Sequence, residues 1–288
     1  MSSQTYDFDT LWNYDNPAAT EQKFRALLAD GQGELPERLE LLTQIARTMG
    51  LGRRFDEAHA LLDDVSSQMT DQMPRVMVRC LLERGRLFNT SGKPIFACPL
   101  FRRAFEIATA HQLDFHSIDA AHMLGIAEAS AQSRLEWNEK ALTIADQTAD
   151  PRAMGWRGPI FNNMGWELFE QKQFERALEL FNRGVVLRIA ANQPRELRIA
   201  RYAVAKTLRA MGRLEEALPM IQSVWEESAA AGDQDGYFEE ELAECLLARG
   251  DAESAQPHFK RAFELLSRDD EFTKSHPDRI NRLKALAK

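Results

Sequence analysis

Apolar residues recur at helical spacing from one end of the chain to the other. Residues 161–184 illustrate the pattern, with large apolar side chains at Phe161, Met164, Leu168, Phe174 and Phe181. Alternation of apolar and polar residues, which is typical of strands, does not persist over any long stretch. Breakers such as Gly50-Leu-Gly52 and Met211-Gly212 separate the helical segments at short intervals. The pattern predicts an all-α protein whose helices are joined by short turns.

Small residues recur in pairs that are twelve positions apart. The pairs are Ala46 and Ala58, Gly85 and Ala97, Gly165 and Ala177, Ala205 and Ala217, and Ala243 and Ala255. Four residues after each pair stands a large apolar residue, namely Leu62, Phe101, Phe181, Ile221 and Phe259. Two antiparallel helices pack closely only where neither presents a long side chain at their crossing. The spacing therefore predicts a series of helix hairpins that cross at the small residues.

These residues resemble the tetratricopeptide repeat (TPR), a helix-turn-helix unit that stacks into solenoids. The family pattern is best matched by Phe161, Met164-Gly165, Leu168, Ala177, Phe181 and Gly184. The resemblance extends over residues 39–270, with a period of 38 to 40 residues instead of the usual 34. It implies an all-α, right-handed α-α superhelical solenoid, in which the first helix of each repeat lines a concave groove.

A single solenoid, residues 1–288, is expected to hold all of the chain, with caps at both ends. Residues 1–36 are predicted to form an N-terminal partial repeat or cap, and residues 37–270 about six repeats. Residues 271–288 are predicted to form a C-terminal capping helix, with apolar side chains on one side at Ile280, Leu283 and Leu286.

Two local features of this organisation can be predicted in more detail. Asn16 is placed to N-cap a helix that begins at Pro17 and ends at Gly31, paired with a short helix around residues 7–14. The third repeat, which contains Leu124-Gly125, is degenerate and has about three residues fewer than the others. We expect a shortened turn there.

Composition narrows the classes of partner. The net charge is −8, so the chain as a whole would repel nucleic acid and anionic membranes. The start of the sequence shows no signal peptide, and no apolar run has the length of a membrane helix. The three cysteines are far apart and odd in number, which favours a reducing, cytoplasmic setting. The excess of Arg over Lys indicates a bacterial, GC-rich genome.

The sequence contains no motif for catalysis or for a cofactor. Phosphate-binding glycine loops, G-x-S-x-G and H-E-x-x-H are all missing. His116, Asp119 and His122 form a weak cluster that we interpret as solvated or core residues and not as a metal site. The acidic run Glu239–Glu241 with Glu244 is interpreted as a solvated helix face. We therefore expect no enzymatic activity, no cofactor and no metal.

The face that the first helices of TPR repeats turn to the groove gives the candidate site. Positions at −6, −3, +1 and +4 from the small residue of each first helix include Arg47, Arg79, Arg86, Asn89, Asn162, Trp166, Phe169, Tyr202, Lys206, Arg209 and Tyr237. Cations interleaved with aromatic rings suit an extended peptide that carries acidic and apolar groups. At the C-terminal end, Glu240 and Glu244 would favour a basic group.

The sequence therefore favours a protein–protein interaction scaffold that binds a peptide or partner segment in its groove. Two alternatives stay open: an intracellular regulatory receptor for a signalling peptide or small effector, and a self-associating structural scaffold. Family members that hold a C-terminal carboxylate use a Lys, Asn and Arg set, of which only Asn162, Lys206 and Arg209 are comparable here. Exchange of Arg86 and Arg209 for glutamate is expected to abolish partner capture and to leave folding intact.

Overall fold

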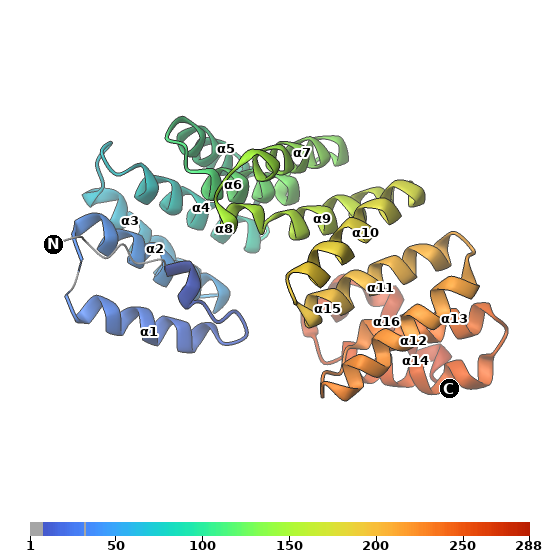
Figure 1. Ribbon diagram of the computed structural model, residues 1–288. Helices are drawn as coiled ribbons and strands as arrows, with labels where there is room; N and C mark the ends of the chain where they lie inside the picture. The colour runs from blue at the N-terminus through green and yellow to red at the C-terminus, as the bar shows by residue number, and fades with distance from the viewer. Residues whose placement is uncertain (1–7, 32) are drawn as a thin grey trace. The chain divides into compact units, whose positions relative to one another are not determined.

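The computed structural model describes residues 8–31 and 33–288, which contain helices and no strand (Figure 1). The predicted all-α class is confirmed. The chain divides into two compact units, and the division falls between Ile160 and Phe161, within the residue range of helix α9. We call residues up to Ile160 unit 1 and residues from Phe161 unit 2.

Unit 1 begins with a short 3-10 helix, η1, and continues with α-helices. Their bounds are η1 Phe8–Leu11, α1 Pro17–Ala29, α2 Leu35–Leu51, α3 Phe55–Gln68, α4 Pro74–Thr90, α5 Pro94–Ala110, α6 Asp114–Ala127, α7 Ala131–Gln147, α8 Pro151–Met154 and α9 Arg157–Glu170. Helix α2 packs against α3, α4 against α5, and α6 against α7. Each of these pairs is a hairpin, and the first helices α2, α4 and α6 also contact one another.

Unit 2 holds the rest of α9 and the helices that follow it. Their bounds are α10 Phe174–Ala190, α11 Pro194–Ala210, α12 Leu214–Ala230, α13 Gly236–Ala248, α14 Ala252–Leu266, α15 Asp270–Ser275 and α16 Pro277–Leu286. Helix α11 packs against α12, α13 against α14, and α11 also against α13. Helix α16 packs on α14.

The small residues lie at the helix crossings, as the spacing predicts. A Cβ atom added to Gly165 would lie 2.8 Å from Cζ of Phe181, and one added to Gly85 would lie 2.8 Å from Cζ of Phe101. Both rings are almost wholly buried. The missing side chain lets the second helix of the pair approach until its phenylalanine covers the first helix. This close approach is the physical reason for a glycine inside an otherwise bulky helix.

The third hairpin differs from its neighbours in its first helix. Helix α6 has 14 residues where α4 has 17, but three residues separate the two helices of the hairpin in both cases. The expectation of a shortened turn is therefore wrong, because the missing residues come from the end of α6. Asn138 takes the place of the phenylalanine that covers the glycine elsewhere, and its Nδ2 donates to the carbonyl oxygen of Gly125 at 3.3 Å.

The ends of the chain carry the expected helix signals. Asn16 Oδ1 accepts a hydrogen bond from the backbone N–H of Ala19 at 3.0 Å, which caps α1. Gly31 follows α1 with a φ of 66°, a left-handed conformation that glycine adopts without strain. Residues 1–7 of the predicted N-terminal cap lie outside the described residues. At the C-terminal end, Ile280 and Leu283 of α16 are buried.

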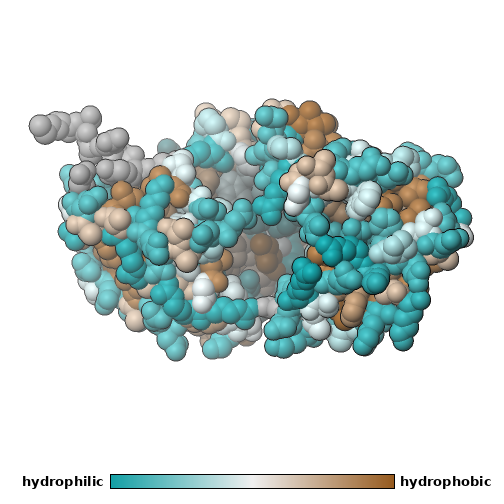
Figure 2. All heavy atoms as spheres, turned by 90° about the horizontal axis from the view of Figure 1, so that it is seen from below, coloured by the Kyte–Doolittle hydropathy of each residue, from teal (hydrophilic) through white to brown (hydrophobic). Residues whose placement is uncertain are grey.

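The surface is mainly polar on the side that Figure 2 shows, where apolar residues form small separate patches. Isolated apolar residues on a surface are normal for a folded chain and do not require a partner. None of the helices in the described residues has the length and apolar character that a membrane crossing requires.

Candidate binding faces of the first helices

The candidate site is described as two surfaces, one in each unit. We call the side of α2, α4 and α6 that carries Arg47, Arg79 and Arg86 the unit 1 face. The corresponding side of α9, α11 and α13, which carries Trp166 and Lys206, is the unit 2 face. Both sets were predicted from their offsets within the repeat.

Arg79 of α4 lies deep in the unit 1 face. Its side chain is only 7% exposed, and its two terminal nitrogens donate to the two carboxylate oxygens of Asp9 at 3.2 and 2.7 Å. Its Nε lies 3.3 Å from Glu40 Oε2 on α2. Such a fork on a carboxylate is the strong, directional form of an ion pair. Arg79 is therefore engaged by carboxylates of the chain itself.

Arg86, about two turns further along α4, is held between two carboxylates. Its guanidinium nitrogens lie 2.6 Å from Glu83 Oε1 and 2.5 Å from Asp119 Oδ1 of α6. Burial raises the pKa of the Asp119 carboxyl, but the positive charges of Arg86 and Arg47 outweigh it and leave that pKa below its usual range. Both partners are thus charged at neutral pH, and they link α4 to α6.

Arg47 of α2 is the more accessible cation of the unit 1 face. Its guanidinium carbon lies 5.2 Å from the ring of Trp12 and 5.3 Å from the ring of Tyr14, and one of its nitrogens is 3.8 Å from Glu83. Asn89, also predicted to belong to this face, is half-buried near the end of α4. The three arginines therefore all have partners within the chain. Arg79 and Arg47 contact the N-terminal segment, whereas Arg86 is paired with carboxylates of α4 and α6.

The three residues of the histidine cluster lie in different surroundings. Among residues 8–31 and 33–288, no group of His, Cys, Asp and Glu side chains is arranged to hold a metal ion. Asp119 is paired with Arg86, and the His122 ring lies 5.0 Å from Trp156. His116 is buried, and its Nε2 has no hydrogen-bond partner. His116 is thus a core residue, and His122 is half-buried beside Trp156.

Acid is expected to destabilise unit 1 through these two histidines. Burial, reinforced by Arg79, lowers the pKa of His116 to about 3, and burial lowers that of His122 to about 4 in spite of Asp119. In the unfolded chain both groups bind a proton below about pH 6.5, so the unfolded state gains protons first. Stability should therefore fall as the pH drops from about 6.5 towards 4, by about 2 kcal/mol per histidine at pH 5.

Urea unfolding at a series of pH values measures this effect. In a His116→Gln variant, the fall in unfolding free energy between pH 7 and pH 5 should be smaller than in the unaltered chain by about 2 kcal/mol. A matched change at the exposed His111, which lies at the end of α5, should leave the fall unchanged. If the unaltered chain, the His116 variant and the His111 variant showed the same pH dependence, the assignment of acid destabilisation to His116 would be contradicted.

The unit 2 face carries a stripe of aromatic rings. The Trp166 ring of α9 lies 5.4 Å from Phe169, 5.0 Å from Phe181 and 6.2 Å from Tyr202 of α11. Trp166 and Phe169 are half-buried, as is Asn162 one turn before Trp166, whereas Tyr202 is only 8% exposed. Trp166 is thus packed on the hairpin core on one side and partly accessible on the other.

Two cations adjoin this aromatic stripe. The ammonium of Lys206 lies 5.6 Å from the centre of the Tyr202 ring and 3.9 Å from Glu241 on α13. Arg209 Nε donates to the same carboxylate, Glu241 Oε1, at 2.5 Å. Burial lowers the pKa of Lys206, against the opposite effect of Glu241. Lys206 and Arg209 thus meet at one carboxylate of α13, and Arg209 is already paired with it.

The acidic run on α13 is not a solvated face, contrary to the interpretation from sequence. Glu240 and Glu241 are 7% and 1% exposed, and each carboxylate in the run has a cationic or imidazole partner. The pairs are Glu239 with His258, Glu240 with Arg279, Glu241 with Arg209, and Glu244 with Arg282. The basic group expected beside Glu240 and Glu244 is thus supplied by α16 of the same chain. Arg279 also lies 5.2 Å from the ring of Tyr237.

Several residues of these faces could not be found from the repeat offsets. Glu83 and Glu241 lie two positions before the small residue of their helix, outside the offsets considered. Asp9, Trp12 and Tyr14 precede the first full repeat. The composition of the N-terminal segment could have indicated these residues, because the stretch from Phe8 to Asp15 combines two acidic residues with three aromatic rings.

Comparison with known proteins supports the fold. No protein-family profile matches the chain, and no curated protein matches its sequence. Among solved structures, a signal transduction ATPase with a tetratricopeptide repeat sensor from Pyrococcus horikoshii matches with a TM-score of 0.71 and 13% identity, over 93% of this chain and 44% of that one. The fold is that of a TPR protein.

Rap proteins share this TPR-like fold. The apo form of RapI matches with a TM-score of 0.66 and 11% identity over 97% of this chain and 84% of that one. A Rap protein complexed with competence and sporulation factor matches with a TM-score of 0.59 and 14% identity over 96% and 82%. Identities this low establish a common fold and leave the function to be argued from the faces themselves.

Proposed function

We propose that the chain is a non-catalytic protein-interaction module whose unit 2 face binds a partner segment with acidic and apolar groups. The observation that carries this proposal is the accessible aromatic stripe of Trp166 and Phe169 beside Lys206. Partly exposed aromatic rings on a firmly packed support are the residues that contribute most binding energy in protein interfaces. Contacts of Trp166 with Phe181 and of Phe169 with Phe174 hold the two rings in place before the ligand arrives.

The charges near the stripe define the orientation of the ligand. Lys206 and Arg209 share a single carboxylate, Glu241, so this corner of the face has one positive charge more than it has negative charges. A carboxylate of a partner segment placed beside Lys206 would balance the charge. Apolar side chains of the same segment would then cover Trp166 and Phe169.

A regulatory receptor for a peptide is the second candidate. Two proteins with the same fold support it, since one carries a tetratricopeptide repeat sensor and the other is a Rap protein complexed with competence and sporulation factor. A receptor and a scaffold would use the same face. They differ in whether the ligand is a free peptide or part of a larger protein.

Selection of peptides tests the proposed face. A phage-displayed library of random peptides is selected on the full chain, and calorimetry then measures the affinity of enriched peptides for the chain and its variants. Enriched peptides should combine carboxylates with large apolar residues. The double change Trp166→Ala and Lys206→Gln should weaken their binding by about 30-fold or more, as expected for a central aromatic anchor.

A matched control changes the second helix of the same hairpin. Arg176→Gln with Val186→Ala removes one exposed cation and one exposed apolar side chain from α10. This control should bind the peptides as the unaltered chain does. The proposal fails if the peptides bind the Trp166 and Lys206 variant with undiminished affinity.

A further inference from the structure

The N-terminal segment, residues 8–14, lies on the unit 1 face in the way a bound peptide would. We propose that this segment is a built-in ligand of the unit 1 face, which a partner carrying a carboxylate three residues before an indole displaces. The inference rests on the proposed function, because it names the partner chemistry that these faces take. Three features carry it: the setting of Asp9, the setting of Trp12 and Tyr14, and the cavity beside Phe8.

Asp9 supplies a charge that the helices lack. Arg75 and Arg79 both lie against Glu40, at 2.5 and 3.3 Å, so two guanidinium groups share this one carboxylate of α2. The Asp9 carboxylate completes the balance and receives the forked hydrogen bonds of Arg79. A fork of this kind is the arrangement by which arginine recognises a carboxylate of a ligand.

The rings of the segment add a second point of recognition. Trp12 Nε1 donates to Gln44 Oε1 of α2 at 3.0 Å, and the Trp12 ring stacks on Tyr14 at 5.0 Å. The guanidinium of Arg47 lies close to both rings. A cation over two stacked rings, with a hydrogen bond to the indole, suits an aromatic side chain at each of these positions. The segment thus has the acidic and aromatic chemistry predicted for an external ligand.

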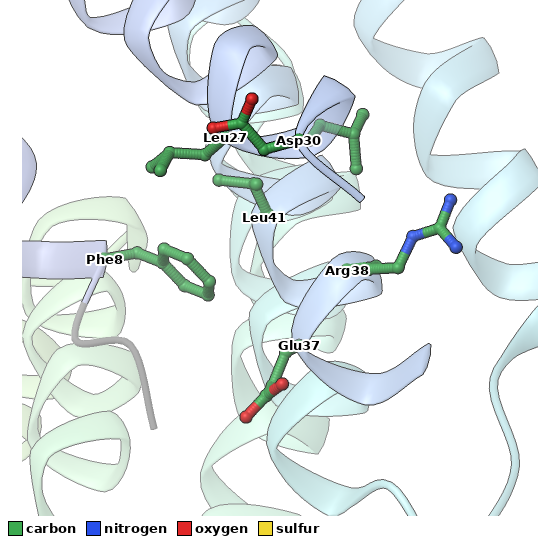
Figure 3. Close-up of a pocket in the computed structure, with 7 residues that line it drawn as sticks. Phe8, Leu27, Asp30, Glu37, Arg38 and Leu41 are labelled. Carbon is green, nitrogen blue, oxygen red and sulfur yellow. The ribbon is translucent and has the colours of Figure 1, made fainter. Parts of the chain in front are cut away.

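The segment is anchored by the buried Phe8, but the space beside this ring is not completely filled. A cavity of roughly 80 Å³ lies beside Phe8, with Leu27, Leu28 and Leu41 among its lining residues. In Figure 3 the Phe8 ring points from η1 towards Leu41 and Leu27 across this space. An incompletely filled site lacks part of the dispersion energy of a close-packed one. Further along the segment, the Tyr14 side chain is 58% exposed. The segment therefore has an incompletely filled cavity beside Phe8 and a solvent-exposed ring at Tyr14.

A partner segment would displace residues 8–14 by competing with them for the same contacts on the unit 1 face. Because the segment is tethered to the face, it competes at an effective concentration on the order of millimolar. A partner segment with the same spacing of carboxylate and rings must exceed this threshold through affinity or through additional contacts. Unit 1 would then be available only to partners that carry a close match to Asp9, Trp12 and Tyr14.

A labelled synthetic peptide tests the inference. Its sequence is FDTLWNYDN, which corresponds to residues 8–16, and fluorescence anisotropy measures its binding. A full-length Asp9→Asn, Trp12→Ala variant should bind the peptide at least tenfold more tightly than the unaltered chain, since its own segment is loosened. A peptide with the same two replacements should bind neither protein. Equal affinity of the two proteins for the first peptide, or binding by neither, would overturn the proposal.

Arg47 identifies the binding face in this experiment. Addition of Arg47→Gln to the loosened variant should reduce peptide affinity at least fivefold, whereas Arg103→Gln, at an exposed position of α5, should not. Trp166 and Lys206 are unaltered throughout, so failure here and failure of the proposed function are separate results. If Arg47→Gln and Arg103→Gln reduced peptide affinity equally, the assignment of the peptide to the unit 1 face would be overturned.

Hydrogen exchange of the unaltered chain provides a test that does not depend on variants. The backbone amides of residues 8–14 should exchange at least tenfold faster than those around Ile45 in α2. Equal protection would show a fixed part of the core and overturn the proposal. Light scattering should give the mass of a single chain. A doubled mass that returns to the single-chain value when the segment is removed would show that the segment binds a second copy, and would overturn the proposal.

Discussion

Replacement of Phe181 by alanine is expected to lower the free energy of unfolding of unit 2 by about 3–5 kcal/mol. The ring is 2% exposed, covers Gly165 and lies 5.0 Å from Trp166. Its removal leaves a cavity at the crossing of α9 and α10, where the surrounding helices can relax only partly. The same change also removes the support of Trp166, so peptide affinity of the unit 2 face should fall with stability.

Denaturant unfolding followed by circular dichroism measures this loss. Val186→Ala provides the control, because Val186 lies on the same helix and is 65% exposed. Its effect should stay within about 0.5 kcal/mol. A loss below about 1 kcal/mol for Phe181→Ala would contradict the hairpin packing described for unit 2.

Exchange of Arg86 for glutamate should destabilise unit 1 by about 3–5 kcal/mol. Arg86 is 15% exposed and lies between Glu83 and Asp119, whose side chains are 2% and 7% exposed. The change would leave three carboxylates close together with one cation fewer among them. Removal of one partner from a buried pair is costly because the other charge remains buried without compensation.

This expectation corrects the one drawn from sequence, by which glutamate at positions 86 and 209 would leave folding intact. Arg209 is likewise paired with the buried Glu241. Arg103→Glu is the matched control, since Arg103 is 61% exposed and pairs only along the surface of α5 with Glu106. That change should cost about 1 kcal/mol or less. A thermal unfolding midpoint for Arg86→Glu equal to that of the control would contradict the buried pairing.

Local spacing made the hairpins predictable. The pairing of Gly165 with Ala177 and the covering ring of Phe181 depend on residues close in sequence, and the requirement for small residues at a helix crossing is general. The cap of α1 by Asn16 is local in the same sense. That the arginines and aromatic residues of the first helices form binding faces was inferred from the offset within a repeat, and it stays a prediction.

Contacts between distant segments could not be predicted in the same way. Asp9 and Arg79 are 70 residues apart, and nothing in the spacing of either pairs them. Arg279 of α16 pairs with Glu240, which lies 39 residues earlier in the sequence. Such distant partners explain why the acidic run of α13 was interpreted from the sequence as solvated although its carboxylates are paired. In the third hairpin the number of missing residues was predictable, but the place of the loss was not.

Photo-crosslinking tests whether the unit 2 face is the binding site, because it identifies the surface that the ligand touches. A photoreactive phenylalanine analogue is placed at Phe169 on the unit 2 face or at Val186 on the second helix, and a selected peptide is added to each protein. We expect crosslinks from position 169 and none above background from position 186. Crosslinks from position 186 with none from position 169 would contradict binding at the unit 2 face.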